Sequence, residues 1–219
     1  MSDRWDGDGP RYYGLYPAIV TAIVDPDQLG RIEVSFPWLG ADGAAVRAWA
    51  TLLSPYAEDG QGFQVLPSVE TQVVVGFEAG DPRRPYIVGA AWNGRESMPE
   101  DPAEPNDKRL IRTRSGCLLE FDDKEGAVRI TLSTPGGHQV VLDDGSREVK
   151  VSHSDGPHVT MTSGGQVKIQ ANSTVEVTAS AVNVHAASAV FDGTITCTTL
   201  TASASVVSPS YTPGAGNVW

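Results

Sequence analysis

The sequence predicts an almost entirely β protein, with a small barrel towards its N-terminus and a repetitive β region after it. Apolar and polar residues alternate along most of the 219 residues, which is the pattern of strands with one buried face. Glycine and proline clusters interrupt this alternation at short intervals, and segments with the periodicity of an amphipathic helix are scarce.

Five candidate strands account for the barrel. They are predicted at residues 15–24, 31–36, 45–53, 71–77 and 86–92. The segments between them carry turn residues, such as the run from Asp25 to Gly30 and the run from Gly80 to Pro82. Five short strands in a segment of this length are typical of a small closed barrel such as the OB-fold.

Composition divides the chain into five parts. We expect an N-terminal arm at 1–11, an OB-fold domain at 12–95, a linker at 96–109, a β-helix spike at 110–207 and a tip segment at 208–219. The linker is rich in proline and carboxylates, which disfavour regular structure. Two prolines and two glycines mark the tip segment as the end of the repeat.

Pairs of apolar residues with one residue between them recur in the spike region. They are Val140/Leu142, Val149/Val151, Val159/Met161, Val167/Ile169, Val175/Val177 and Val182/Val184. The pairs stand 9, 10, 8, 8 and 7 residues apart, so each repeat has room for one strand and one corner. Regular pairs of β-branched residues favour strands over the alternative of a disordered polar tail.

A repeat this short needs partners. One strand buries its apolar face only against another element, and pairs of valines are a small core for so many ordered residues. Three chains wound together would pair every strand edge and remove an aggregation hazard. The hexapeptide and calcium-binding nonapeptide β-helices have other periods or motifs.

Charge and cysteine content exclude several classes of protein. The net charge is −11, which argues against a nucleic-acid partner because like charges repel. Cys117 and Cys197 form no disulfide framework, and we interpret them as small apolar strand residues. The start of the chain is polar, and no apolar run approaches the roughly 20 residues of a membrane helix. We therefore expect synthesis in the bacterial cytoplasm without a signal peptide.

Four segments carry a family likeness. They are LGRIEVSFPW at 29–38, GFEAGDPRRP at 76–85 with Gly89 after it, RTRSG at 112–116 and LEFDD at 119–123. In order and spacing they resemble phage baseplate assembly protein V and the matching part of the VgrG spike proteins of type VI secretion. We expect structural roles for the motif residues Gly30, Phe36, Pro37, Trp38, Gly76, Phe77, Gly80, Asp81, Pro82 and Pro85.

The resemblance implies an OB-fold followed by a triple-stranded β-helix, or β-prism, in an entwined parallel homotrimer without a cofactor. In such machines the OB-fold lies under a hub, and sheath contraction drives the prism through the target envelope. VgrG proteins carry their hub before the OB-fold, whereas only the arm 1–11 precedes it here. We therefore expect a separate hub protein, in a phage tail, virion or extracellular injection particle.

Metal and catalytic candidates are few. Some short phage spikes bind iron through a His-x-His motif, which is absent. A trimer would bring three copies of His185 to the threefold axis, so His185 is the one candidate metal ligand, against the alternative of an exposed corner residue. The carboxylate pairs Asp122/Asp123 and Asp143/Asp144 point to opposite faces of a strand and cannot flank one bond. We expect no catalytic residue and no enzyme.

The tip segment has two interpretations. Tyr211, Pro213 and Trp219 could dock a tip-sharpening protein with a PAAR fold, as related spikes do, or they could belong to a loose tail. A terminal Trp on such a tail would be an unusual exposed apolar group.

The hypothesis from the sequence is a mechanical, membrane-piercing trimer at the centre of a contractile phage tail or phage-like injection system. Two alternatives stay open: a tail-associated depolymerase, and a monomeric OB-fold module that binds glycan or protein. The three tryptophans Trp38, Trp49 and Trp92 are expected to pack the barrel or the trimer contact, although a ligand-stacking role for Trp38 is the alternative.

Overall fold

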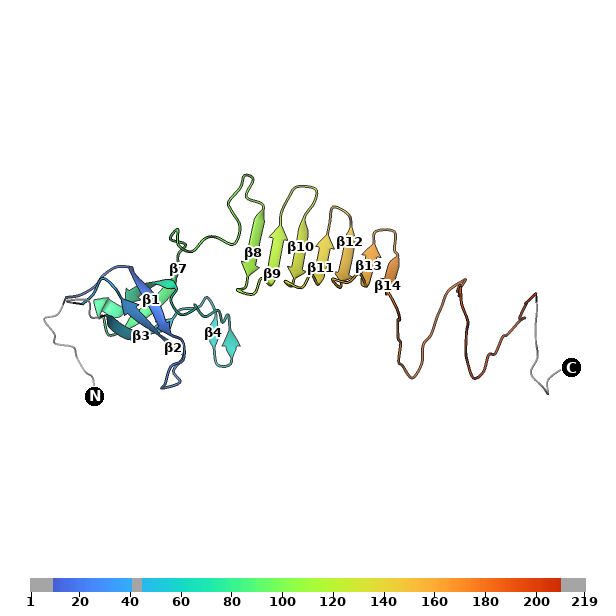
Figure 1. Ribbon diagram of the computed structural model, residues 1–219, viewed down its shortest axis with the longest axis horizontal. Helices are drawn as coiled ribbons and strands as arrows, with labels where there is room; N and C mark the ends of the chain where they lie inside the picture. Colours follow the sequence, from blue (N-terminus) through green and yellow to red (C-terminus); the bar gives the residue numbers. More distant parts are fainter. Residues whose placement is uncertain (1–9, 41–44, 210–219) are drawn as a thin grey trace.

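The computed structural model describes residues 10–40 and 45–209. The chain is elongated: a barrel lies at the N-terminal end, a meandering sheet follows, and a strand-free segment forms the far end (Figure 1). Within the described residues, the single helical element is the 3₁₀ turn η1 (Glu78–Gly80), and no helix there is long and apolar enough to cross a membrane.

Five strands close the barrel. They are β1 (Tyr16–Ala22), β2 (Arg31–Phe36), β3 (Val46–Leu52), β6 (Gln72–Phe77) and β7 (Pro85–Ala90). Their order around the barrel is β1-β2-β3-β7-β6, and only the pair β3 and β7 is parallel. The predicted all-β class and the predicted closed five-stranded barrel are confirmed, with strand ends shifted by no more than two residues.

The barrel has a complete core of its own. Nine hydrophobic residues are at most 1% exposed; they are Ala18, Val20, Ile32, Val34, Phe36, Ala50, Val73, Val75 and Ile87. Alternation produces this core, because every second residue of a strand points to the same face. Phe36 is the largest of these side chains.

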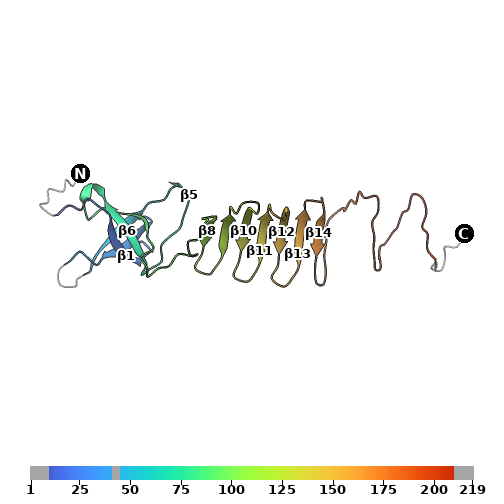
Figure 2. The ribbon, with the colours of Figure 1, turned by 90° about the horizontal axis from the view of Figure 1, so that it is seen from above.

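A small hairpin projects from the barrel between β3 and β6. It consists of β4 (Ala57–Glu58) and β5 (Gln61–Gly62), and it lies on the side of the barrel that faces the sheet (Figures 1 and 2). The five strands predicted for the barrel do not include these two.

Seven strands form the second sheet. They are β8 (Lys108–Arg112), β9 (Leu118–Asp122), β10 (Arg129–Ser133), β11 (Gln139–Asp143), β12 (Glu148–Ser152), β13 (His158–Thr162) and β14 (Val167–Gln170). Each strand pairs with the next one along the chain, always antiparallel. The repeat was expected to pair its strands between chains, whereas up to Gln170 it pairs them within one chain.

Tight glycine turns explain this hairpin pairing. Gly116, Gly137, Gly156 and Gly165 all have positive φ, between 74° and 109°, which glycine adopts without steric cost. Each of their N–H groups donates to the carbonyl three residues earlier, as Gly137 does to Thr134 at 3.0 Å. Such a turn reverses the chain within a few residues, so consecutive strands meet as neighbours.

The strands end at Gln170, although apolar pairs continue beyond it. Residues 171–209 form no strand and are exposed throughout, and they run away from the sheet in wide bends (Figures 1 and 2). The sequence has no glycine from Ala171 to Asp192, so the glycine turns that follow β8, β10, β12 and β13 do not recur in that stretch.

Candidate assembly interface

One face of the β8–β14 sheet is apolar along almost its whole length. Residues that alternate along the strands give it thirteen apolar side chains: Ile111, Leu119, Phe121, Ile130, Leu132, Val140, Leu142, Val149, Val151, Val159, Met161, Val167 and Ile169. We call this surface the apolar face. Several of its members are half exposed or more, for example Leu132 at 53% and Ile169 at 64%.

The strand register makes the apolar face continuous. Leu142 lies opposite Val149, and Met161 lies opposite Val167. Paired residues of this kind have side chains close enough to touch across the strands. The apolar face is therefore a stripe that is two residues wide and passes from strand to strand.

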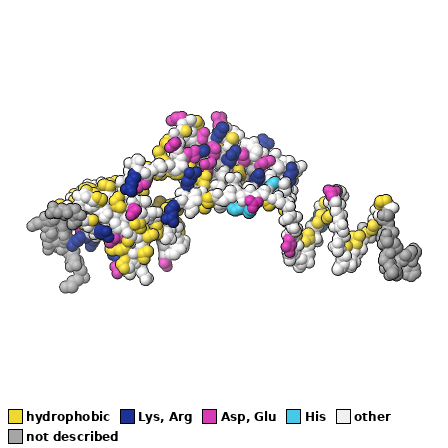
Figure 3. All heavy atoms as spheres, in the orientation of Figure 1, with side chains coloured by type: hydrophobic (Ala, Val, Ile, Leu, Met, Phe, Trp, Pro, Cys, Tyr) yellow, Lys and Arg dark blue, Asp and Glu magenta, His cyan; other side chains and the backbone are white. Residues whose placement is uncertain are grey.

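The other face of the sheet carries the charged side chains of the strands, with Leu110, Leu118 and Val141 among them. Figure 3 shows charged side chains gathered over the sheet on the side that faces the viewer. Arg129 and Asp143 stand opposite each other and form an ion pair at 3.1 Å. The pKa of Asp143 is lowered from its ordinary value, first by the N–H of Ser146 and then by Arg129.

The asymmetry of the two faces marks the apolar face as an interface. A contiguous apolar surface of this extent is rare on soluble monomers and indicates a protein contact. Since the charged face can remain in water, only the apolar face of the sheet needs to be covered by another surface.

The strand-free segment carries the same type of surface without a sheet. Val177, Val184 and Leu200 are 69%, 71% and 72% exposed. Lys and Arg are absent from Ala171 onwards, and Glu176 and Asp192 are the two acids of this part. An extended segment with two charged residues and exposed apolar pairs has no cover of its own.

The histidines do not gather into a metal site. His138 and His153 have ring centroids 4.3 Å apart where neighbouring turns stack, whereas His185 stands alone in the exposed strand-free segment. In the described ranges no group of three or more potential metal ligands occurs. His185 stays a prediction, because it needs copies from other chains.

The paired carboxylates lie in turns and in ion pairs. Asp122 is the last residue of β9 and accepts a hydrogen bond from the N–H of Lys124 at 3.1 Å. Asp123 and Asp144 follow their strands, where their N–H groups donate to the carbonyls of Asp107 and Val128.

The aromatic residues of the Phe36-Pro37-Trp38 motif pack at one end of the barrel. Trp38 stacks on Tyr16 with centroids 4.7 Å apart, and its Nε1 donates to the carbonyl of Pro17 at 2.7 Å. Phe36 and Phe77 lie 5.5 Å apart beneath them. Tyr12, which precedes β1, contacts the same group of rings, so the barrel's own side chains fill this end.

The Gly80-Asp81-Pro82 motif packs against residues 11–13, which precede β1. Gly80 has φ +78°, and a Cβ there would lie 3.1–3.2 Å from atoms of Arg11, Tyr12 and Tyr13. Its carbonyl accepts the N–H of Tyr12 at 3.0 Å. Hydrogen bonds from Arg83 lower the pKa of Asp81 from its ordinary value.

The other motif residues occupy ordinary structural positions. Gly30 has φ +70° in the β1–β2 turn, and Gly76 lies in β6 beneath Leu15 and Val88. Pro85 is buried, Pro82 is half-buried and Pro37 is exposed.

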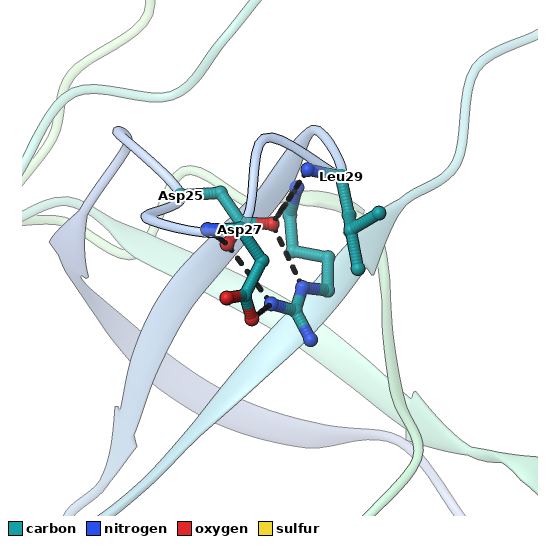
Figure 4. Close-up of polar contacts among 4 residues, drawn as sticks. Asp25, Asp27 and Leu29 are labelled. Carbon is teal, nitrogen blue, oxygen red and sulfur yellow. Dashed lines mark hydrogen bonds and ion pairs between the residues drawn. The ribbon is translucent and has the colours of Figure 1, made fainter.

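Sequence reasoning missed an ionic cluster in the β1–β2 turn. Asp25 has a side chain only 2% exposed and binds Arg31 at 2.8 Å, while Asp27 binds the same guanidinium at 2.7 Å (Figure 4). Asp25 also accepts the N–H groups of Asp27 and Leu29. The Arg31 hydrogen bond holds the pKa of Asp25 well below its ordinary value. The spacing Asp25-x-Asp27-x₃-Arg31 was the available signal.

Of the three tryptophans, Trp38 packs the barrel end and Trp49 lies beneath the Arg31 guanidinium at 5.8 Å. Trp92 is 63% exposed. The tip candidates Tyr211, Pro213 and Trp219 lie outside the described residues.

Together these features define an all-β protein in which an OB-like barrel is joined to an extended β region with an uncovered interface. Residues 16–92 match the family described as the type VI secretion system/phage-baseplate injector OB domain. The predicted resemblance to baseplate assembly protein V and VgrG spike proteins is thereby confirmed.

Curated relatives include type VI secretion spike proteins. The chain is 25% identical over 130 residues to VgrG3 of Vibrio cholerae. The aligned region covers 56% of this chain and 13% of that relative. With VgrG5 of Pseudomonas aeruginosa the identity is 29% over 133 residues, covering 55% and 17%. With VgrG4b of the same organism it is 30% over 154 residues, covering 67% and 16%. The chain thus spans less than a fifth of the length of each of these relatives.

Proposed function

We propose that this chain is one third of a parallel trimeric spike, the central mechanical element of a contractile phage tail or phage-like injection system. The observation that carries the proposal is the apolar face, which is exposed along the β8–β14 sheet and is followed by an equally exposed strand-free segment. Three copies around one axis would turn these surfaces inwards and leave the charged faces in water.

The strand-free segment supports winding of the chains around each other. Thirty-nine residues, 171–209, have no strand partner in their own chain, although buried backbone groups need hydrogen bonds. Neighbouring copies would supply those bonds as the triple-stranded β-helix that the resemblance implies. The spike would then have two parts, a prism of three meanders and an entwined distal part.

Its action would be mechanical and not enzymatic, without a cofactor. The stacked turns give axial stiffness, since the Gly137 turn packs directly on Ser154. Entwined chains separate slowly, which gives kinetic stability. The distal part has only two charged residues among 171–209, so few charges need desolvation when it pierces a membrane.

The resemblance supplies the proposed partners. The barrel end is assigned to a baseplate hub protein, and the distal end to a PAAR-type tip protein. The particle would assemble from cytoplasmic components into a virion or an extracellular injection particle.

Light scattering on the purified chain tests the trimer. We expect a mass of three times 23.2 kDa, or 69.6 kDa, that does not change on dilution. A mass of 23.2 kDa would overturn the proposal and would favour the monomeric binding module.

A further inference from the structure

The β4–β5 hairpin is exposed and yet firmly built. The Ser54 hydroxyl lies 2.9 Å and 2.8 Å from the carbonyls of Tyr56 and Phe63, and the Tyr56 hydroxyl donates to Gln61 at 2.8 Å. A Cβ on Gly62 would lie 2.7 Å from the Tyr56 carbonyl, so only glycine fits there. An isolated two-stranded hairpin is marginally stable in water, and this one has the bonds to hold a defined shape.

An apolar groove lies between this hairpin segment and the barrel. Its volume is about 260 Å³, and its lining consists of Leu52, Leu53, Ser54, Pro55, Phe63, Val65, Leu66, Pro67, Val73, Ile87, Gly89 and Ala90. No charged side chain belongs to this lining. Phe63 and Val65 on its wall are 54% and 61% exposed, so the groove fits an apolar side chain and is open to one.

The groove also borders a strand edge that is only partly used. β7 pairs with β3 at two positions, Thr51 with Tyr86 and Leu52 with Ile87. Gly89, which lines the groove, has no atom within 4 Å of the place where a Cβ would stand, so there is room for a side chain above it. A strand edge with few partners accepts a further extended segment.

The segment after β7, residues 91–107, offers such a chain with apolar side chains. Trp92 and Met98 are 63% and 42% exposed. The segment is fixed to its own sheet: Glu100 binds Lys108 at 2.7 Å and raises its pKa, and Arg112 donates to the carbonyl of Pro99 at 3.2 Å. It is therefore presented as an ordered surface.

The β4–β5 hairpin and the 91–107 segment lie at the same height along the long axis of the chain. The hairpin and the 91–107 segment overlap along the long axis and lie on different sides of the chain (Figures 1 and 2). A threefold rotation about that axis changes the side of a segment and keeps its level. In a trimer, the 91–107 segment of the next copy therefore comes round to the level of the hairpin.

We propose that the groove beside the β4–β5 hairpin binds the 91–107 segment of a neighbouring copy, with Met98 as the apolar side chain that enters it. This inference rests on the proposed trimer and assigns a second contact, between barrel and linker, outside the axial interface. Met suits the role because its unbranched, polarizable side chain adapts to irregular gaps. The contact would lock each barrel to the next spike strand.

Cysteine cross-linking tests the contact on the full chain. In a background of Cys117→Ala and Cys197→Ala, the pair Gln64→Cys and Ser97→Cys places one thiol on each surface and leaves Phe63, Val65 and Met98 intact. Treatment with a short bis-maleimide should convert most of the chain to covalent dimers and trimers in a denaturing gel. The matched control pair, Leu29→Cys and Ser97→Cys, uses a side chain 67% exposed in the β1–β2 turn and should stay monomeric.

Light scattering on the same samples separates the two proposals. A 69.6 kDa particle (3 × 23.2 kDa) whose Gln64/Ser97 variant cross-links only within one chain, or not at all, would overturn this contact and leave the spike standing. A 23.2 kDa particle would overturn both. Covalent trimers from the first pair alone would support the contact.

Discussion

The barrel and the β8–β14 sheet differ in how far they bury their apolar side chains. In the described part of the chain, all nine buried hydrophobic residues belong to the barrel. Thr160, at 8% exposure, is the one buried residue of the sheet, although its strands carry thirteen apolar side chains on one face. The barrel closes on itself and so buries both edges and core, whereas the sheet stays open.

This difference shows where one chain is sufficient and where it is not. Closure gives the barrel a core that does not depend on other molecules. Each strand of the sheet is hydrogen-bonded to its neighbours, but the apolar face has no cover. The 171–209 segment has neither strand pairing nor cover. Dependence on partners therefore increases from the barrel to the tip.

The largest effect is expected from a charged substitution on the apolar face. Val151→Asp would place three carboxylates in the trimer interior, each with a desolvation penalty of several kcal/mol. We expect the mass in light scattering to fall from 69.6 kDa, three times 23.2 kDa, to 23.2 kDa. Lys150→Asp, the next residue of β12 on the polar face, is the matched control and should stay trimeric. Equal masses for the two variants would contradict the assignment of the faces.

The next effect is confined to the barrel. Phe36→Ala removes the largest buried side chain and should cost about 3–5 kcal/mol of barrel stability. Trp38, whose ring lies 5.8 Å from that of Phe36, reports the transition by fluorescence. The exposed Leu29→Ala should change stability by less than about 0.5 kcal/mol. Loss of the trimer mass at temperatures where only the barrel has melted would show that the two regions are not independent.

A smaller effect tests the stacked turns. Gly137→Ala forces a positive φ on alanine and brings its Cβ to 3.3 Å from the Ser154 Cβ, which should cost about 1–3 kcal/mol. Gly136→Ala, one residue earlier, meets nothing closer than 3.7 Å and serves as control. Thermal unfolding followed by circular dichroism should place the Gly137 variant clearly below the Gly136 variant, and the reverse order would contradict the stacking.

The smallest effect is a pH dependence of the barrel. The pKa of Asp25 is lowered from its ordinary value of 3.8, chiefly by Arg31. A carboxyl with a lowered folded pKa stabilises the fold above its unfolded pKa, and this contribution is lost as pH falls through the folded pKa. The denaturant midpoint of the barrel should therefore be level near neutral pH and decline below about pH 4.

Asp25→Asn should lower the denaturant midpoint near pH 7 and flatten its decline at low pH. The exposed Asp27→Asn should retain the decline. A decline of the same depth in the Asp25→Asn variant would show that other carboxylates cause it.

Much of the barrel could be predicted from the sequence, because the alternation of apolar and polar residues within a strand identifies that strand without knowledge of its neighbours. Arg31–Phe36 was predicted with both ends correct, and β1, β3, β6 and β7 differ by one or two residues. The Asp25–Arg31 cluster was missed because turn residues were interpreted only by their backbone preference. Its side chains meet through the shape of the turn, which residue type alone does not reveal.

The pairing of the spike region was harder to predict. The apolar pairs from Val140 to Ile169 all lie on the apolar face, but a Val-x-Val pair carries no information on which strand lies beside it. The signal was in the corners: Gly116, Gly137, Gly156 and Gly165 permit hairpins, and glycine is then absent from Ala171 to Asp192. The trimer, the metal at His185 and the tip contacts stay predictions, since they depend on further chains or on residues outside the described ones.

Hydrogen–deuterium exchange of residues 171–209 in the intact protein is the most direct test of the account. These residues have no strand partner in their own chain, so protection of their amides must come from other copies. We predict exchange as slow as that of the β8–β14 strands. Exchange at the rate of an unstructured peptide would contradict the entwined spike.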